Sequence, residues 1–213
     1  MIPLLSVIIR CKNEEQWIGH CIQSVIDSFD YPEIIVVDNK STDESLEIAR
    51  MFEHHVNITK MTLENYSPGK ALNSAIKIAN SNYILILSAH CVINEVQSDI
   101  FDLLNDYVSV FGKQIPVFKG RKISRRYIWS NFNSERTVNL FSVQENRYFL
   151  HNALALYKKD ILINNPFDEN LYGKEDRYWA KKMIDNGNSI LYEPNFKCLH
   201  HWTPNGATWK GIG

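Results

Sequence analysis

Groups capable of chemistry follow three apolar segments in the first half of the chain. They occupy the stretches Arg10–Glu14, Asp38–Asp43 and Ser88–His90. Guanidinium, carboxylate and imidazole groups form charged hydrogen bonds, bind metal ions or move protons. Because ligands bind just beyond the carboxyl ends of the strands in open α/β sheets, we expect these stretches to form one site. The simpler alternative for Ser88–His90 is a strand that runs into a turn, with a histidine that only makes a local hydrogen bond.

The segments that precede these groups have the composition of buried strands. Tyr83–Leu87 is apolar without alternation, which is typical of a strand covered on both faces. Runs rich in β-branched residues predict further strands at residues 4–10, 33–38 and 59–62. Helical periodicity predicts helices at residues 17–26, 45–52 and 70–79, and Asn13 is the expected N-cap of the first. This alternation predicts an α/β fold with a parallel central sheet flanked by helices.

The second half of the chain has a less regular pattern. Ile100–Phe111 predicts a helix that runs into a strand, and Arg147–Tyr157 predicts a strand with a polar interruption. Asn188–Glu193 predicts a final strand that Pro194 ends. Between these elements, residues 119–147 are polar, basic and aromatic without a clear period, which is typical of a long loop.

Composition excludes several classes of protein. The 213 residues suit one domain, and a hydrophobic fraction of 45% is ample for a core. A net charge of −1 gives no reason to expect a nucleic-acid partner. The four cysteines are widely spaced and are expected to be reduced, as in a cytoplasmic protein. The N-terminus has no signal-peptide pattern, and no apolar run approaches the roughly 20 residues that span a bilayer. We expect a cytoplasmic location. Peripheral association with the inner face of the membrane is compatible with this expectation.

Three motifs in the first half resemble a known family. They are Ser-Val-Ile-Ile-Arg-Cys-Lys-Asn-Glu-Glu at 6–15, Val-Val-Asp-Asn-Lys-Ser-Thr-Asp-Glu-Ser at 36–45 and Gly-Lys-Ala-Leu-Asn-Ser-Ala at 69–75. In this order they resemble the N-terminal half of the family 2 inverting glycosyltransferases of GT-A fold, over residues 6 to about 93. The resemblance implies one GT-A domain over residues 1–213, with a Rossmann-like and mostly parallel sheet. Residues 1–93 would bind the nucleotide, and residues 94–213 would bind the acceptor and carry the catalytic groups.

The resemblance also implies roles for residues in the nucleotide-binding half. Asp38 matches the acid that hydrogen-bonds the nucleotide base, and Glu14 falls where the family has an acid near the ribose. Lys70 and Asn73 fall in the helix that lines the nucleotide pocket, although Lys70 also fits a solvated lysine at a helix start. The full set of expected nucleotide-binding residues is Arg10, Asn13, Glu14, Asp38, Lys70, Asn73, Ser88 and Ala89.

The chain departs from the family where a metal ion is expected. The family usually has Asp-x-Asp at the end of the central strand, where it holds Mg²⁺ or Mn²⁺ against the diphosphate, whereas this chain has Ser88-Ala89-His90. Imidazole binds Mn²⁺ better than Mg²⁺, and the resemblance implies a histidine near the C-terminus that closes the metal site. We therefore expect His90 and either His200 or His201, with diphosphate oxygens and water, to bind a Mn²⁺-like ion. The alternative is metal-independent transfer, in which a basic cluster neutralises the diphosphate. That cluster consists of Lys119, Arg121, Lys122, Arg125 and Arg126.

Two stretches of the second half are candidates for sugar binding and catalysis. Glu175-Asp176 opens a predicted helix, where acids are favoured by the helix dipole alone. The pair nevertheless resembles the Glu-Asp motif that supplies the family's catalytic base. We therefore expect Asp176 to be the base and Glu175 to orient the acceptor, with these two roles open to exchange. By the same resemblance, His151 and Asn152 are candidate sugar contacts.

These features together predict an inverting glycosyltransferase. The donor would be a sugar linked to UDP, dTDP or GDP, and the acceptor would be a saccharide or a lipid-linked saccharide in surface polysaccharide synthesis. The Ser-Ala-His-Cys sequence and the later Gly-Lys-Gln-Ile-Pro resemble bacterial transferases of the rhamnosyl or capsule type. The alternative is a non-catalytic module that only binds nucleotide sugars, which the missing carboxylates suggest. The presence of Glu175 and Asp176 favours the enzyme, because a binding module needs no base.

Overall fold

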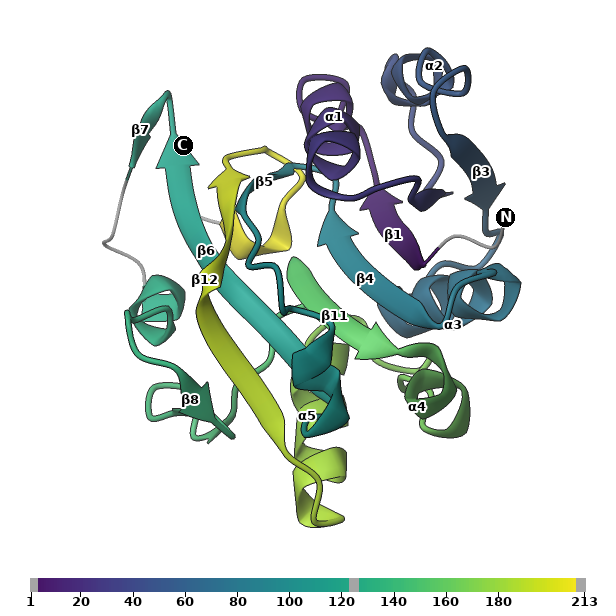
Figure 1. Cartoon of the computed structure of the whole chain (residues 1–213). Coiled ribbons are helices and arrows are strands. Elements are labelled where there is room, and N and C mark those ends of the chain that lie inside the picture. Colours follow the sequence, from purple (N-terminus) through teal and green to yellow (C-terminus); the bar gives the residue numbers. More distant parts are fainter. Residues whose placement is uncertain (1–3, 123–126, 210–213) are drawn as a thin grey trace.

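The first half of the chain alternates strands and helices, as predicted. The computed structural model describes residues 4–122 and 127–209, and Figure 1 shows them. The elements of this half are β1 (Leu5–Cys11), α1 (Ile18–Ser28), β2 (Glu33–Asp38), α2 (Ser45–Arg50), β3 (Asn57–Thr62), α3 (Pro68–Ile78) and β4 (Tyr83–Ser88). The strands lie in the order β3-β2-β1-β4, and every neighbouring pair among them is parallel. The predicted parallel sheet is confirmed for this half.

The second half extends the same sheet with mixed strand directions. Its elements are β5 (Cys91–Glu95), β6 (Ser109–Phe118), β7 (Arg121–Lys122), β8 (Thr137–Val138), β9 (Phe141–Ser142), β10 (Arg147–Tyr148), β11 (Leu154–Lys158), α4 (Lys159–Asn164), α5 (Glu175–Asp185) and β12 (Ile190–His201). Short 3₁₀ turns lie at Asp102–Asn105, Tyr127–Asn131 and Ala207–Trp209. The sheet continues from β4 as β11-β6-β12-β5, where β11 is antiparallel to both β4 and β6, and β12 is parallel to β6.

Helices cover both faces of this sheet, and alternate residues of each strand point to opposite faces. Ile8 and Ile86 pack on one face with residues of α3 and α5, whereas Val7 and Leu87 pack on the other face with residues of α1. The two faces are visible in Figure 1, where α1 lies on one side of β1 and β4 and α3 lies on the other. The buried strands therefore have the continuous apolar sequences that predict them. None of the helices in the described ranges has both the length and the apolar sequence needed to cross a bilayer.

Three expectations about the elements are wrong. Asn13 does not cap α1, because the helix begins at Ile18 and has no side-chain cap. Asn13 instead has a positive φ of 52°, and its side-chain oxygen accepts a hydrogen bond from the backbone N–H of Thr42 at 2.8 Å. The predicted helix within Ile100–Phe111 is only the 3₁₀ turn Asp102–Asn105, and the strand that follows starts at Ser109.

The third correction concerns Pro194, which does not end the last strand. β12 continues to His201, and its register with β6 shifts between Glu193 and Lys197. Such an irregularity accommodates a proline, which cannot donate a ladder hydrogen bond. The continuation matters for function because it carries His200 and His201 to the edge of the sheet where β4 ends in Ser88 and His90 follows.

Candidate active site

The polar groups that follow β1, β2 and β4 lie together at one edge of the sheet. In the parallel register, Arg10 is beside Ser88 of β4, and Cys11 is beside Asp38 of β2. Parallel strands end at the same edge, so this convergence follows from the strand directions. The carboxyl edge of β1, β2 and β4 therefore forms the floor of the candidate site.

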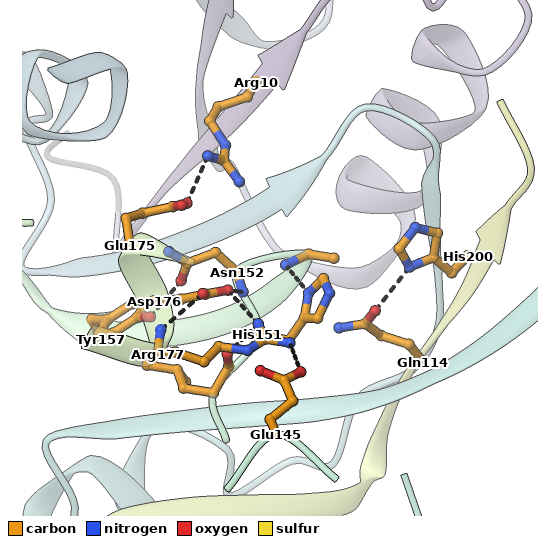
Figure 2. Close-up of polar contacts among 12 residues, drawn as sticks. Arg10, Gln114, Glu145, His151, Asn152, Tyr157, Glu175, Asp176, Arg177 and His200 are labelled. Atoms are coloured by element: carbon orange, nitrogen blue, oxygen red, sulfur yellow. Dashed lines mark hydrogen bonds and ion pairs between the residues drawn. The ribbon is translucent and has the colours of Figure 1, made fainter. Parts of the chain in front are cut away.

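The acidic pair at the start of α5 reaches this edge through Arg10. Arg10 donates from its guanidinium to Glu175 Oε1 at 2.8 Å, a contact between β1 and α5 that Figure 2 shows. Lys174, the residue before the helix, has a φ of 61°, a left-handed conformation that is uncommon for a residue other than glycine. This turn brings both carboxylates into the first turn of α5, where the helix dipole favours negative charge.

Asp176 is buried, and three hydrogen bonds hold its carboxylate. Oδ1 accepts from the backbone N–H of Arg177 at 2.8 Å, whereas Oδ2 accepts from the backbone N–H of Asn152 at 3.1 Å and from the Arg177 guanidinium at 2.8 Å. Burial alone would raise the pKa of Asp176, but the Arg177 guanidinium and the two N–H groups lower it below the ordinary aspartate value. The group is therefore ionised at neutral pH. Since a carboxylate has about four acceptor positions, one position on Oδ1 is left without a partner among the residues that the structure describes.

Arg177 and Glu145 belong to the site, and the sequence analysis did not find them. The Arg177 guanidinium donates to the carbonyl of Leu150 at 2.7 Å and to Glu145 at 3.4 Å, and it lies 4.2 Å from the centre of the Phe149 ring. These contacts fix the cation beside Asp176 (Figure 2). No spacing in the sequence points to Glu145, because it lies 32 residues from Arg177 in the aperiodic segment.

A cavity of about 290 Å³ lies against these side chains. Its lining includes Arg10, Glu145, His151, Glu175, Asp176 and Arg177. His151 is buried, and its Nδ1 accepts from the backbone N–H of Ala153 at 3.2 Å. Burial and the neighbouring Arg177 lower the pKa of His151 to about 3, so the ring is neutral and its one proton is on Nε2. His151 is thus a fixed, uncharged hydrogen-bond donor at the cavity.

Asn152, the other candidate sugar contact, makes its hydrogen bonds within the protein. Its backbone N–H binds Asp176, and its side-chain oxygen accepts from the hydroxyl of Tyr157 at 2.5 Å. The residue is 1% exposed. The structure therefore places Asn152 behind the acidic pair, where it positions Asp176, and does not place its side chain among the residues that line the cavity.

The low pKa of His151 gives a prediction for stability against pH. Between about pH 6.5 and about pH 3 the unfolded chain binds a proton at this residue and the folded chain does not. The free energy of unfolding therefore decreases as the pH falls through this range, by up to about 1.4 kcal/mol per pH unit for this group. We expect His151→Gln to reduce this dependence by about one proton, measured by urea unfolding between pH 7 and pH 4. Equal slopes for the two proteins would contradict the buried neutral ring.

His90 and His200 form a pair next to this cavity. Their Nε2 atoms are 3.0 Å apart, and the ring of His151 lies 6.1 Å from that of His200. The remaining nitrogens have separate partners: His90 Nδ1 lies 3.1 Å from Glu14 Oε1, and His200 Nδ1 lies 2.8 Å from Gln114 Oε1. Burial lowers the pKa of His200 well below the ordinary histidine value, so this ring is neutral. Gln114, on β6, is a member of the site that the sequence did not indicate.

His201, the other candidate ligand, points elsewhere. Its ring stacks on Trp17 at 3.9 Å between centres, on the side of the sheet that α1 covers. Burial, together with His20 and His90, lowers its pKa to about 4. Of the two expected partners, the structure brings the ring of His200 to that of His90, whereas His201 reaches His90 only through its backbone N–H, which donates to the His90 carbonyl at 2.9 Å. Within residues 4–122 and 127–209, no group of three or more histidine, cysteine, aspartate and glutamate side chains is arranged to hold a metal ion.

Glu14 and Asn73 have contacts that differ from the expected contacts with a nucleotide. Glu14 is 5% exposed, and its carboxylate lies against His90. The amide of Asn73 is engaged through both its nitrogen and its oxygen, because it exchanges two hydrogen bonds with the backbone of Phe167 at 2.9 and 3.0 Å and donates to Glu169 at 3.0 Å. Asn73 therefore joins α3 to the segment before α5.

The other expected nucleotide-binding residues lie around the same edge. Asp38 accepts from the backbone N–H of Ser41 at 3.0 Å, and Lys70 lines a second cavity, of about 490 Å³, with Tyr66 and Tyr172. Ser88 is half-buried, whereas Ala89 is fully buried. In the basic cluster, Lys119, Arg121 and Lys122 are exposed around the β6–β7 turn. Arg125 and Arg126 lie outside the described residues.

Sequence comparison identifies relatives over most of the chain. TarS of Staphylococcus aureus, a poly(ribitol-phosphate) beta-N-acetylglucosaminyltransferase, is 26% identical over 87% of this chain, and the match covers 33% of TarS. The glycosyltransferase AglE of Haloferax volcanii is 26% identical over 98% of this chain and 70% of its own. The chain thus spans about a third of the length of TarS.

Solved structures show the same fold. The structure of S. aureus TarS 1–349 in complex with UDP-GlcNAc has a TM-score of 0.72 at 22% identity, over 98% of this chain and 61% of that one. The mannosyltransferase PcManGT from Pyrobaculum calidifontis, in complex with GDP-Man and Mn²⁺, has a TM-score of 0.69 at 20% identity, over 97% of this chain and 59% of that one. The fold is that of the GT-A enzymes. A sequence model described as "Glycosyl transferase family 2" matches residues 6–165. The chain therefore belongs to glycosyl transferase family 2.

Proposed function

We propose that this chain transfers a sugar from a nucleoside-diphosphate donor to a saccharide or lipid-linked acceptor, with inversion, in surface polysaccharide synthesis. The observation that carries the proposal is the contact of Arg10 with Glu175 beside an ionised Asp176, at the cavity that His151 also lines. TarS, whose structure contains UDP-GlcNAc, makes a UDP-sugar the first donor to test. The proposed location is the cytoplasm, at the inner face of the membrane where lipid-linked acceptors are found.

The proposed roles follow from the charges and hydrogen bonds. Inversion requires one base opposite the leaving group, and Asp176 has an open acceptor position for the acceptor hydroxyl. Glu175, held by Arg10, orients the acceptor, and the Nε2–H of His151 donates to a sugar hydroxyl. Residues 1–93 would bind the nucleotide, with Asp38 at the base and Lys70 at its cavity. Residues 94–213 would supply the carboxylates of Glu175 and Asp176, so the reaction would take place where the two halves meet.

A divalent metal ion is common in GT-A enzymes, and PcManGT was solved with Mn²⁺. The residues that would hold an ion in this chain are His90 and His200, whose Nε2 atoms converge. This donor set fits an ion that accepts nitrogen ligands, although the protein provides only two of them. A bound divalent ion supplies Lewis-acid stabilisation of the negative charge that develops on the leaving diphosphate.

Donor cleavage tests the proposal. Purified protein is incubated with UDP-GlcNAc, a dTDP-sugar or a GDP-sugar, with Mn²⁺ or with EDTA, and release of the nucleoside diphosphate is measured. We expect release from one donor class with Mn²⁺, in the presence of a saccharide acceptor or slowly with water. Activity that is lost in EDTA and restored by Mn²⁺ supports the metal. Full activity in EDTA would instead favour neutralisation of the diphosphate by Lys119, Arg121 and Lys122.

The alternative function is a non-catalytic module that binds nucleotide sugars. Thermal unfolding with UDP, GDP, dTDP or CMP distinguishes the two, because a ligand that binds only the folded state raises Tm. A binding module would be stabilised by a nucleotide and would release no diphosphate with any donor. That combination of results would overturn the proposed transferase.

A further inference from the structure

The environment of the His90–His200 pair sets which nitrogen of each ring carries a proton. Glu14 is a carboxylate, and a carboxylate only accepts hydrogen bonds. With Glu14 Oε1 at 3.1 Å, His90 therefore keeps its proton on Nδ1, and its Nε2 presents a lone pair toward His200. The carboxyl group of Glu14 is buried, and its Oε2 has no hydrogen-bond partner among the described residues. Among these residues, therefore, His90 is the one group that hydrogen-bonds to the Glu14 carboxylate.

Gln114 acts on His200 in a related but reversible way. An amide can accept through its oxygen or donate through its nitrogen, depending on which atom faces the ring. With Oε1 toward His200 at 2.8 Å, His200 carries its proton on Nδ1, and both Nε2 lone pairs point into the same space. The nitrogen of the Gln114 amide has no hydrogen-bond partner among the described residues, so no hydrogen bond from that nitrogen holds the amide in this orientation. Turning it allows His200 to donate from Nε2 to His90 when no ion is present.

The separation of the two Nε2 atoms fits two ligands of one ion. Nitrogen ligands at about 2.1 Å from a metal ion and at right angles to each other are about 3.0 Å apart. The observed separation is 3.0 Å. Histidines that bind metal ions commonly donate their other ring N–H to a carboxylate or a carbonyl, which is the arrangement that Glu14 and Gln114 provide here.

We propose that Glu14 and Gln114 are positioning residues for a two-imidazole metal centre that takes Mn²⁺, Co²⁺ or Zn²⁺ and discriminates against Mg²⁺. The inference rests on the proposed function, since oxygen atoms of the donor diphosphate and water complete the coordination. The discrimination follows from ligand chemistry: imidazole suits the transition ions, whereas Mg²⁺ prefers carboxylate and water oxygens. This centre replaces the two carboxylates that the family resemblance implies at residues 88 and 90.

Electron paramagnetic resonance of bound Mn²⁺ tests the ligands directly. The full chain is titrated with Mn²⁺ in the presence of UDP, and nitrogen couplings are measured by electron spin-echo envelope modulation. We expect couplings from directly bound imidazole nitrogen, and we expect a 100-fold excess of Mg²⁺ to leave most of the Mn²⁺ in place. Absence of nitrogen coupling, or displacement by an equal concentration of Mg²⁺, would overturn the proposal.

Variants separate the positioning residues from their neighbours. Glu14→Gln and Gln114→Leu are each expected to weaken Mn²⁺ binding by about 10- to 100-fold. His201→Ala is the matched control, because it removes an adjacent imidazole that stacks on Trp17, and it should leave the affinity and the nitrogen coupling unchanged. Equal affinities for the wild type and both positioning variants would contradict their role.

A further variant keeps the test decisive if a buried substitution prevents folding. His90→Asp changes a half-buried position, and it should reduce the nitrogen coupling and raise the competition from Mg²⁺ at least 10-fold. The spectroscopy uses UDP and needs no turnover, so its outcome is independent of catalysis. Donor cleavage without nitrogen coupling overturns the metal centre alone. Nitrogen coupling without any cleavage of a nucleotide sugar overturns the proposed transferase alone.

Discussion

Replacement of Asp176 by asparagine is expected to lower kcat for sugar transfer by about 10²- to 10⁴-fold, the usual contribution of a general base. The amide has nearly the same size as the carboxylate, but it cannot take a proton from the acceptor hydroxyl. The wild-type group can, because Arg177 and two backbone N–H groups keep the pKa of Asp176 low in spite of its burial, so the carboxylate is ionised at neutral pH. Nucleotide binding should change little, since the hydrogen-bond partners of Asp176 are Asn152 and Arg177, and neither is among the expected nucleotide-binding residues.

Helix α5 contains a matched control for this variant. Asp185 is at the other end of the helix, where its exposed carboxylate pairs with Lys181 at 2.5 Å. Asp185→Asn makes the same chemical change on the same element and should leave kcat within about twofold, as expected for a surface pair of little energetic consequence. Transfer rates are measured at saturating donor, and UDP affinity is measured by calorimetry. An Asp176→Asn enzyme with wild-type kcat would show that another group is the base.

The sequence predicted those parts of the site that depend on local pattern. The apolar runs before Arg10, Asp38 and Ser88 predict buried parallel strands, and parallel strands necessarily end at one edge. The family resemblance indicated the acidic pair. In the structure Glu175 contacts Arg10, although the two residues are 165 positions apart in the sequence. These features could be predicted because each depends either on the period of a short segment or on an ordered set of motifs.

Other parts of the site depend on long-range packing and could not be predicted. The choice between His200 and His201 is set by the register of β12 after the irregularity near Pro194, since a shift of one residue would exchange the sides to which they point. Gln114 and Glu145 have no distinguishing spacing, and they join the site only because β6 and the segment before β10 lie beside it. Asn73 is a further case, because nothing in its motif indicates that its amide binds a backbone segment 94 residues away.

Substitution of Gly69 by alanine is expected to destabilise the fold, although alanine has the higher helix propensity. Propensity alone predicts a gain of up to about 1 kcal/mol. However, a Cβ on Gly69 would lie 2.3 Å from the carbonyl oxygen of Asp168 and 2.8 Å from its carbonyl carbon. Both atoms are backbone, and hydrogen bonds from Ser67 and Asn73 hold that backbone against α3. Overpacking of this kind costs about 1–3 kcal/mol or more, so the contact outweighs the propensity.

Gly19 gives the control that separates propensity from contact. It is the second residue of α1, as Gly69 is of α3, and both helices have 11 residues. A Cβ on Gly19 would meet only side-chain atoms, at 3.1 Å from Ile48 and 3.8 Å from Phe52, and these can move by a few tenths of an ångström. Urea unfolding should therefore show a lower midpoint for Gly69→Ala and an unchanged or higher midpoint for Gly19→Ala. Equal shifts would mean that α3 does not lie closely against Asp168. Contacts other than those with α3 would then have to hold the segment around Asp168, which precedes the acidic pair.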